Sequence, residues 1–116
     1  MQQWPEILDQ SKSNGQLKLQ LQIPKDLIQF DGHFPGFPIL PGVVQIDWVI
    51  KLAKQHLQWE QPFLGLENIK FQNMILPGTQ LTLEITADAN KNRLSFVYFS
   101  DKEKYSSGKI IFKSTS

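Results

Sequence analysis

The chain contains no cysteine, which leaves its two histidines as the side chains best suited to move protons. The lack of a thiol excludes cysteine nucleophiles and cysteine-ligated metals. Imidazole titrates near neutrality and can act as a base at physiological pH. His56 lies beside Lys54 and Gln55, and we interpret it as structural or exposed. His33 lies in an unusual proline-rich segment and is the candidate for chemistry.

The segment around His33 reads F-D-G-H-F-P-G-F-P-I-L-P-G over residues 30–42. Prolines at positions 35, 38 and 41 recur every third residue, which excludes a regular strand or helix and predicts a stiff loop. An extended polyproline-type ligand for an aromatic groove is an alternative interpretation. However, the segment leads directly into an apolar run, so we expect it to belong to the folded core.

That apolar run, from Gly42 to about Leu57, has no glycine or proline after its first residue and predicts a largely buried helix. Pro41 suits the first helical turn, so the amides of Gly42, Val43 and Val44 should lack helical partners. These donors, at the positive end of the helix dipole, could hold a carbonyl oxygen that gains negative charge. Many helices begin this way without any function, so this pattern alone is not specific.

The rest of the chain follows the period of two that is typical of half-buried strands. One strand is predicted over 17–23, after Asn14-Gly15 and before Pro24, and about four more near residues 69–72, 81–86, 94–98 and 105–112. Turn chemistry falls at 76–78 and 88–92. A long helix beside an antiparallel meander can bury its apolar surface by lying across the concave face of a curled sheet. We therefore expect an α+β fold.

Length and charge limit the possible classes of protein. With 116 residues, the chain is expected to be a single domain over 1–116. Twelve basic and eleven acidic side chains give a net charge of +1, which argues against a nucleic-acid partner. The first ten residues include Glu6 and Asp9 and do not suggest a signal peptide, and no apolar run approaches the ~18 residues of a membrane span. We expect a soluble cytoplasmic protein without a membrane partner.

The motif around His33 resembles that of a known family. The strings G-H-F-P-G at 32–36 and P-I-L-P-G-V at 38–43, with Asp47 fourteen positions after His33, resemble the FabA/FabZ-type 3-hydroxyacyl-acyl-carrier-protein dehydratases. Residues 70–78, from K-F to L-P-G, are similar to another conserved stretch of that family. The short chain and the string G-V-V-Q-I-D-W look most like the small dehydratases of aryl-polyene and related acyl pathways.

This resemblance implies a hotdog fold, in which a curled antiparallel sheet wraps one long central helix. It implies a homodimer with active sites between subunits, where the histidine of one protomer faces the acid of the other. The implied substrate is a 3-hydroxyacyl group on the phosphopantetheine of an acyl carrier protein, in fatty-acid-like or polyene biosynthesis. The product would be the trans-2-enoyl thioester, and neither a cofactor nor a metal is expected.

The resemblance also implies roles for individual residues. His33 would remove the C2 proton as a base, and Asp47 would act as the acid that lets the C3 hydroxyl leave as water. The amides of Gly42 and Val43 would bind the thioester carbonyl. The aromatic side chains that could wall an acyl pocket, although each could equally be a core residue, are Phe30, Phe34, Phe37 and Trp48.

Asp47 has a second interpretation that spacing alone favours. It begins a polar helical stripe that could simply face solvent, formed by Asp47, Lys51, Lys54, Gln55 and Gln58. Asp47 would then pair with Lys51 on the surface. The family commonly has glutamine where Lys51 stands. A cation at this position favours an ionised Asp47, which suits electrostatic anchoring better than proton donation.

Two other functions share the predicted fold. A hotdog acyl-thioesterase acts on the same kind of substrate, but the H-F-P-G string is not its mark. A non-catalytic acyl-binding subunit is the second alternative, and the presence of both His33 and Asp47 argues against it. Four lysines could meet an acidic carrier protein or merely solvate strand faces: Lys18, Lys70, Lys109 and Lys113.

Overall fold

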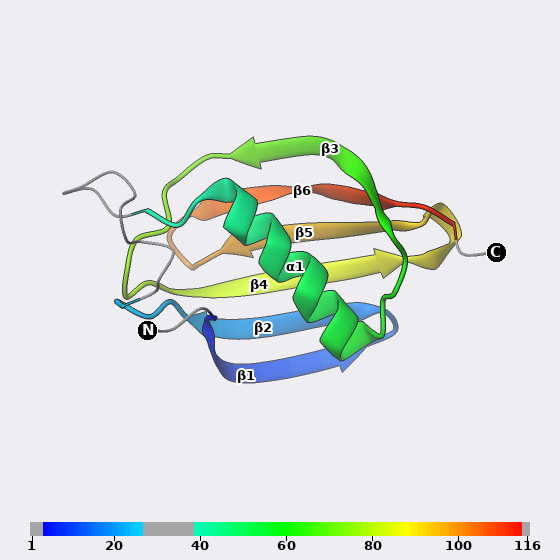
Figure 1. Cartoon of the computed structure of the whole chain (residues 1–116). Coiled ribbons are helices and arrows are strands. Elements are labelled where there is room, and N and C mark those ends of the chain that lie inside the picture. The colour runs from blue at the N-terminus through cyan, green and yellow to red at the C-terminus, as the bar shows by residue number, and fades with distance from the viewer. Residues whose placement is uncertain (1–3, 27–38, 115–116) are drawn as a thin grey trace.

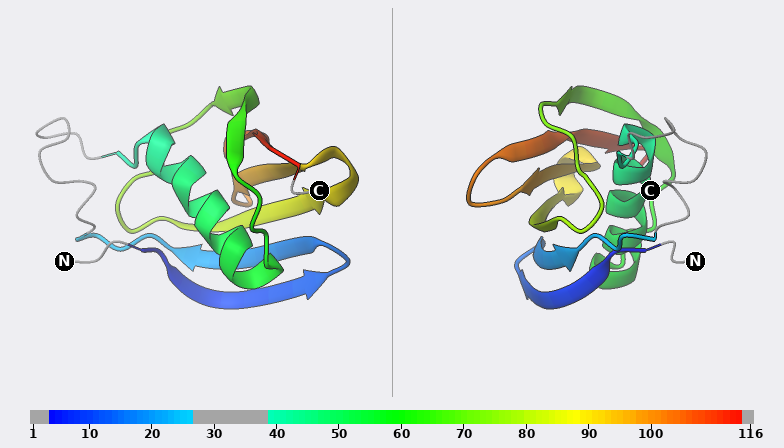
Figure 2. Two further views of the ribbon diagram at one scale, coloured as in Figure 1. Left: turned by 45° about the vertical axis from the view of Figure 1, so that its right-hand side comes forward. Right: turned by 90° about the vertical axis from the view of Figure 1, so that its left-hand side faces the viewer.

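The architecture is one helix packed across one face of a six-stranded antiparallel sheet. The structure is a computed structural model that describes residues 4–26 and 39–114. In chain order the elements are β1 (Glu6–Ser13), β2 (Gln16–Gln22), α1 (Gly42–Leu57), β3 (Phe63–Phe71), β4 (Gln80–Asp88), the 3-10 turn η2 (Ala89–Lys91), β5 (Arg93–Phe99) and β6 (Lys104–Phe112). The strand order across the sheet is β1-β2-β4-β5-β6-β3. The helix runs diagonally across the sheet (Figure 1), and the sheet curls around it (Figure 2).

This arrangement confirms the predicted α+β fold with a central helix. The helix begins at Gly42 and ends at Leu57, as the absence of glycine and proline between them predicted. Four strands follow it, and Pro77 and Gly78 form the predicted turn before β4, with Gly78 at a φ of +83°. The predicted place of Pro41 in the first helical turn was wrong by one residue. Its extended backbone, with φ −61° and ψ 147°, makes it the N-cap rather than a residue of the first turn.

The first strand, β1, was not predicted. All eight of its residues are exposed, so it lacks the alternation that marks a half-buried strand. It pairs with β2 through a hairpin whose two turn residues have positive φ, Asn14 at 48° and Gly15 at 80°. An Asn-Gly pair is the preferred sequence for such a two-residue turn, and this signal could have revealed the strand.

The core lies between the concave face of the sheet and one face of α1. Leucine, isoleucine and aromatic residues that alternate along β2, β4 and β5 are buried, among them Leu19, Leu83 and Phe96. They belong to the same apolar cluster as Trp48 and Val49 on the helix. The prediction of a largely buried helix was wrong in extent. Only one face is covered, whereas the opposite face exposes polar side chains and Val43, which is 74% exposed.

The two edges of the sheet differ in character. The edge strand β1 is mostly polar and carries a bulge, two features that discourage pairing with another chain. The other edge strand, β3, exposes four large apolar side chains, namely Phe63, Leu64, Leu66 and Phe71. An unpaired strand edge with exposed apolar residues is a typical surface for association. In the described ranges, no helix is both long and apolar enough to cross a membrane.

Candidate active site

The start of α1 presents two backbone donors. The carbonyl of Pro41 accepts hydrogen bonds from the amides of Val44 and Gln45, each at 3.1 Å. The expectation that the Val44 amide is free was therefore wrong, because this amide forms a hydrogen bond within a tight first turn. No side chain caps this terminus, and the amides of Gly42 and Val43 have no partner among the described residues. Two of the three predicted donors thus remain available at the positive end of the helix dipole.

A pocket opens beside these donors. It is lined by residues 39–42, Gln45 and residues 71–74, so the first turn of α1 faces the end of β3 and the chain that follows it. A Cβ at position 42 would overlap the ring of Phe71, so the ring lies directly against Gly42 and would have to move to admit a larger residue. Phe71 and Met74 are 53% and 52% exposed and give the pocket an apolar wall. The sequence analysis did not identify Phe71 as part of the site.

A buried hydrogen-bond network holds the first turn of the helix against the sheet. The side chain of Gln45, 3% exposed, donates from Nε2 to the carbonyl of Leu40 at 3.0 Å. Its Oε1 accepts a hydrogen bond from Ser106 Oγ in β6 at 2.6 Å. The Tyr98 hydroxyl in β5 donates to the backbone carbonyl of Gln45 at 2.7 Å. Side chains from two strands thereby fix the orientation of the free amides one turn earlier.

Tyr98 is suited to act as a permanent donor in this network. Its side chain is fully buried. Burial, with a further contribution from the negative charge of Asp47, raises the pKa of the Tyr98 phenol well above its usual value of 10.0. The hydroxyl therefore keeps its proton throughout the physiological range. A polar residue within the apolar run, at helical spacing from Trp48, Val49 and Leu52, was the available sequence signal for Gln45.

Asp47 lies on the exposed side of the helix. Its Oδ2 is 2.9 Å from Lys51 Nζ, and the two side chains are 49% and 55% exposed. The surface ion pair that spacing favoured is therefore present. Asp47 is not among the residues that line the pocket beside Gly42. It lies instead one turn beyond Val43 on the same face, because residues four apart are helical neighbours.

The remaining candidates are divided between the core and the undescribed segment. Phe30, His33, Phe34 and Phe37 lie outside the described residues. Trp48 is 1% exposed and belongs to the apolar core, away from the pocket beside Gly42. His56 is partly buried near the far end of the helix, and its backbone carbonyl accepts from Lys12 Nζ at 3.1 Å. Within 4–26 and 39–114, no three histidine, aspartate or glutamate side chains lie close enough to form a metal site.

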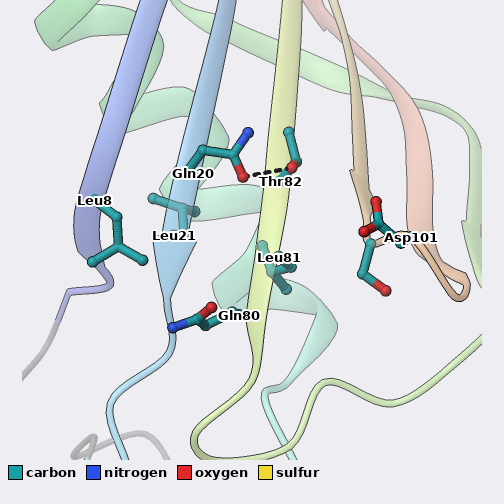
Figure 3. A pocket seen from close by; sticks show the side chains of 8 residues that line it. Leu8, Gln20, Leu21, Gln80, Leu81, Thr82 and Asp101 are labelled. Atoms are coloured by element: carbon teal, nitrogen blue, oxygen red, sulfur yellow. Dashed lines mark hydrogen bonds between the residues drawn. The ribbon is translucent and has the colours of Figure 1, made fainter.

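A second pocket lies on the outer face of the sheet, away from the helix (Figure 3). Its lining includes Leu8, Gln20, Leu81, Thr82 and Asp101, and Thr82 Oγ1 donates to Gln20 Oε1 at 2.9 Å. No histidine faces Asp101 among the lining residues. This pocket therefore offers no acid and base pair, and the candidate site remains at the start of α1.

One long helix wrapped by a curled antiparallel sheet defines a hotdog-fold protein, as in the dehydratase domain of the polyketide PpsC from Mycobacterium tuberculosis, which matches with a TM-score of 0.67 at 17% identity. That likeness concerns the fold alone. The model of the ApeI-like family, described as ApeI dehydratase, matches residues 9–109, and the chain belongs to this family of dehydratases. The predicted resemblance to FabA/FabZ-type dehydratases and their aryl-polyene relatives is thus confirmed.

Two solved structures are similar over nearly the whole chain. The dehydratase heterocomplex ApeI:P from Xenorhabdus doucetiae contains a chain with 37% identity and a TM-score of 0.86, covering 93% of this chain and 96% of that one. An uncharacterized protein from Erwinia carotovora subsp. atroseptica has 40% identity and a TM-score of 0.80, covering 97% of this chain and 98% of that one.

Curated relatives carry the description 3-hydroxyacyl-[acyl-carrier-protein] dehydratase FabZ. The one from Oenococcus oeni is 31% identical over 93 residues, which cover 72% of this chain and 67% of the relative. The one from Lawsonia intracellularis is 35% identical over 75 residues, covering 56% of this chain and 49% of the relative. The chain thus spans between about half and two thirds of the length of these two relatives.

The network around Gln45 generates a stability prediction. Gln45→Leu keeps the volume of the side chain but leaves the Leu40 carbonyl and the Ser106 hydroxyl buried without partners, so we expect a loss of about 2 to 4 kcal/mol in the free energy of unfolding. Adding Ser106→Ala should recover about 1 kcal/mol, because one of the unpaired groups is then removed. Urea unfolding measures both values. Gln55→Leu, on the exposed face, is the control and should change stability by less than about 0.5 kcal/mol. An equal effect of Gln45→Leu and Gln55→Leu would contradict the network.

Proposed function

We propose that the chain dehydrates a 3-hydroxyacyl thioester, carried on the phosphopantetheine of an acyl carrier protein, to the trans-2-enoyl thioester. The observation that carries the proposal is the pair of free amides at Gly42 and Val43 beside a pocket, in a chain of the ApeI-like dehydratase family. The FabZ descriptions of the curated relatives support the acyl-carrier substrate. Fatty-acid-like or polyene synthesis is the corresponding metabolic role.

The elimination needs a base, an acid and a place for negative charge. His33 takes the C2 proton, and the electron pair moves toward the thioester carbonyl. The oxygen of that carbonyl gains negative charge, which the amides of Gly42 and Val43 stabilise in the transition state. The C3–O bond breaks as Asp47 gives its proton to the hydroxyl, which leaves as water. The proton on His33 then restores Asp47, so the reaction is balanced without a redox partner.

The exposed position of Asp47 supports a site shared between two chains. Asp47 is half exposed and does not line the pocket beside Gly42 of its own chain. In the proposed mechanism it therefore acts on a substrate that is bound partly by a second chain. The apolar edge of β3 offers the surface for that association. We propose a homodimer with a sheet continuous across the interface. The ApeI:P heterocomplex of the Xenorhabdus relative makes a related dehydratase chain the second candidate partner.

For the base, we expect His33→Ala to lower kcat by at least about 10²-fold, the typical loss when a general base is removed. His33 lies outside the described residues, so the chemistry itself must test its role. Formation of the enoyl thioester from 3-hydroxyacyl thioesters of several chain lengths, followed by mass spectrometry, measures the rate and also detects free acid from any thioesterase activity. The matched control is His56→Ala, which should retain most of the parent rate. If His33→Ala forms the enoyl thioester at the rate of the parent protein, this mechanism is wrong.

For the acid, Asp47→Asn keeps a hydrogen-bonding side chain but removes the proton, so we expect dehydration to fall by about 10²-fold while the substrate still binds. Asp47→Glu should retain part of the rate because it keeps the carboxyl group. Loss of the exposed pair with Lys51 should cost stability only about 0.3 to 0.5 kcal/mol. Absorbance of the enoyl thioester follows the reaction. Glu84→Gln removes a carboxylate that pairs with Lys18 at 3.9 Å and serves as the control. Equal rates for the parent and Asp47→Asn would leave Asp47 as a surface residue.

For the assembly, we expect light scattering at micromolar concentration to give the mass of a dimer. Leu64→Lys places a charge on the apolar edge strand β3, where Leu64 is 56% exposed, and should yield monomers with little activity. Leu8→Lys places the same charge on the opposite edge strand, where Leu8 is 50% exposed, and should remain a dimer. A parent protein that is monomeric, or a Leu64→Lys variant that stays dimeric, would contradict the proposed interface.

A further inference from the structure

Lys51 is held at its charged end by two groups that are far apart in the sequence. Its Nζ is 2.9 Å from Asp47 Oδ2 and 5.4 Å from the centroid of the Trp4 ring. Trp4 lies just before β1, in the segment that the sequence analysis left without structure. An ammonium group over an indole face is attracted by the negative face of the ring. The N-terminal segment therefore contacts the helix at the candidate acid.

This ion pair differs from the others in the described ranges. The Lys54–Glu60 and Lys18–Glu84 pairs are longer, at 3.8 Å and 3.9 Å. Among residues 4–26 and 39–114, Lys51 is also the one cation that lies over an aromatic ring. A lysine four residues from an aspartate normally samples many rotamers, since its side chain is long and flexible. The attraction of the indole favours the rotamers that place Nζ beside the carboxylate.

We propose that Trp4 and Lys51 are positioning residues that hold the Asp47 carboxyl in a single orientation. Lys51 contacts Oδ2, which leaves Oδ1 as the oxygen that would meet the substrate hydroxyl. The role proposed for the cation is to orient the carboxyl, in place of the electrostatic anchoring that its charge alone suggested. This inference rests on the proposed role of Asp47 in dehydration. It assigns a function to Lys51 and to the aromatic residue that precedes β1.

The kinetic test uses Lys51→Gln, Lys51→Arg, Trp4→Leu and Trp4→Phe in the full chain. We expect Lys51→Gln to lower kcat about tenfold with little change in KM, because a misplaced catalytic group slows the chemical step more than it weakens binding. Trp4→Leu should lower kcat by a smaller factor. Arginine at 51 and phenylalanine at 4 should restore most of the rate, since each keeps the cation or the ring.

Combined variants separate a relay from two independent effects. Trp4→Leu added to Lys51→Gln should cause no further loss, because Trp4 acts through Lys51. Neither change should matter in an Asp47→Asn background. Lys54→Gln, three residues along the same helix, is the control and should keep the parent rate. Independent, multiplicative losses from Trp4→Leu and Lys51→Gln would overturn the proposal, as would an unchanged or faster Lys51→Gln enzyme.

A second measurement does not depend on activity. With 5-fluorotryptophan in place of tryptophan, the fluorine resonance of Trp4, assigned by its loss in Trp4→Phe, should shift in Lys51→Gln and stay in place in Lys54→Gln. An unshifted Trp4 resonance would overturn the contact itself. If Asp47→Asn dehydrates at the parent rate while the resonance still shifts, the contact exists but the proposed function of Asp47 has failed, and the positioning role fails with it.

Discussion

The site depends on a hydrogen-bonded glutamine in an otherwise apolar interface. Gln45 connects the loop before the helix to strand β6 through its two side-chain atoms, while Tyr98 binds its backbone carbonyl. A buried polar group is costly unless its partners are correctly placed, so the network tolerates few alternative positions of the helix. Because Gln45 is fixed in this way, the unpaired amides of Gly42 and Val43 in the same turn of the helix are fixed in orientation too. Apolar packing alone would allow the helix to rotate or slide more easily.

The helix divides the chemistry between two surfaces. Its sheet-facing side and first turn provide the pocket with Gly42 and Phe71, whereas its exposed side carries Asp47 and Lys51. A side chain on a helix cannot reach both surfaces, because positions 42 and 47 project in different directions. In the proposed site, a second chain covers both surfaces and brings one substrate to the amides and to the carboxylate. The apolar edge of β3 is consistent with that arrangement.

The N-terminal segment contacts the helix at the candidate acid. Trp4 contacts Lys51, and this lysine forms the shortest ion pair in the described part of the chain. The pair is half exposed, so its value for stability is small. The consequence that we propose is geometric, namely the orientation of the Asp47 carboxyl. A small dehydratase could in this way control the orientation of its acid from outside the pocket.

Sequence alone determined the elements whose signal is local. Period-two alternation identified β2, β4 and β5, and the absence of glycine and proline identified the helix with its observed bounds. The H-F-P-G string and the spacing to Asp47 identified the dehydratase family, although the roles of His33 and Asp47 stay predictions. The exposed strand β1 was not predicted, because neither of its faces is buried and its sequence therefore has no apolar period.

Only the tertiary structure decided which distant residues meet. It brought Ser106 and Tyr98 to Gln45, placed Phe71 against Gly42 and Trp4 beside Lys51, and left Asp47 outside the lining of the pocket. It also showed that the amide of Val44 donates a hydrogen bond to the carbonyl of Pro41. These contacts depend on the curvature and strand order of the sheet, which bring together residues as distant in sequence as Gln45 and Ser106, 61 positions apart. Periodicity reports only which face of an element is apolar, and it cannot report which neighbour that face will meet.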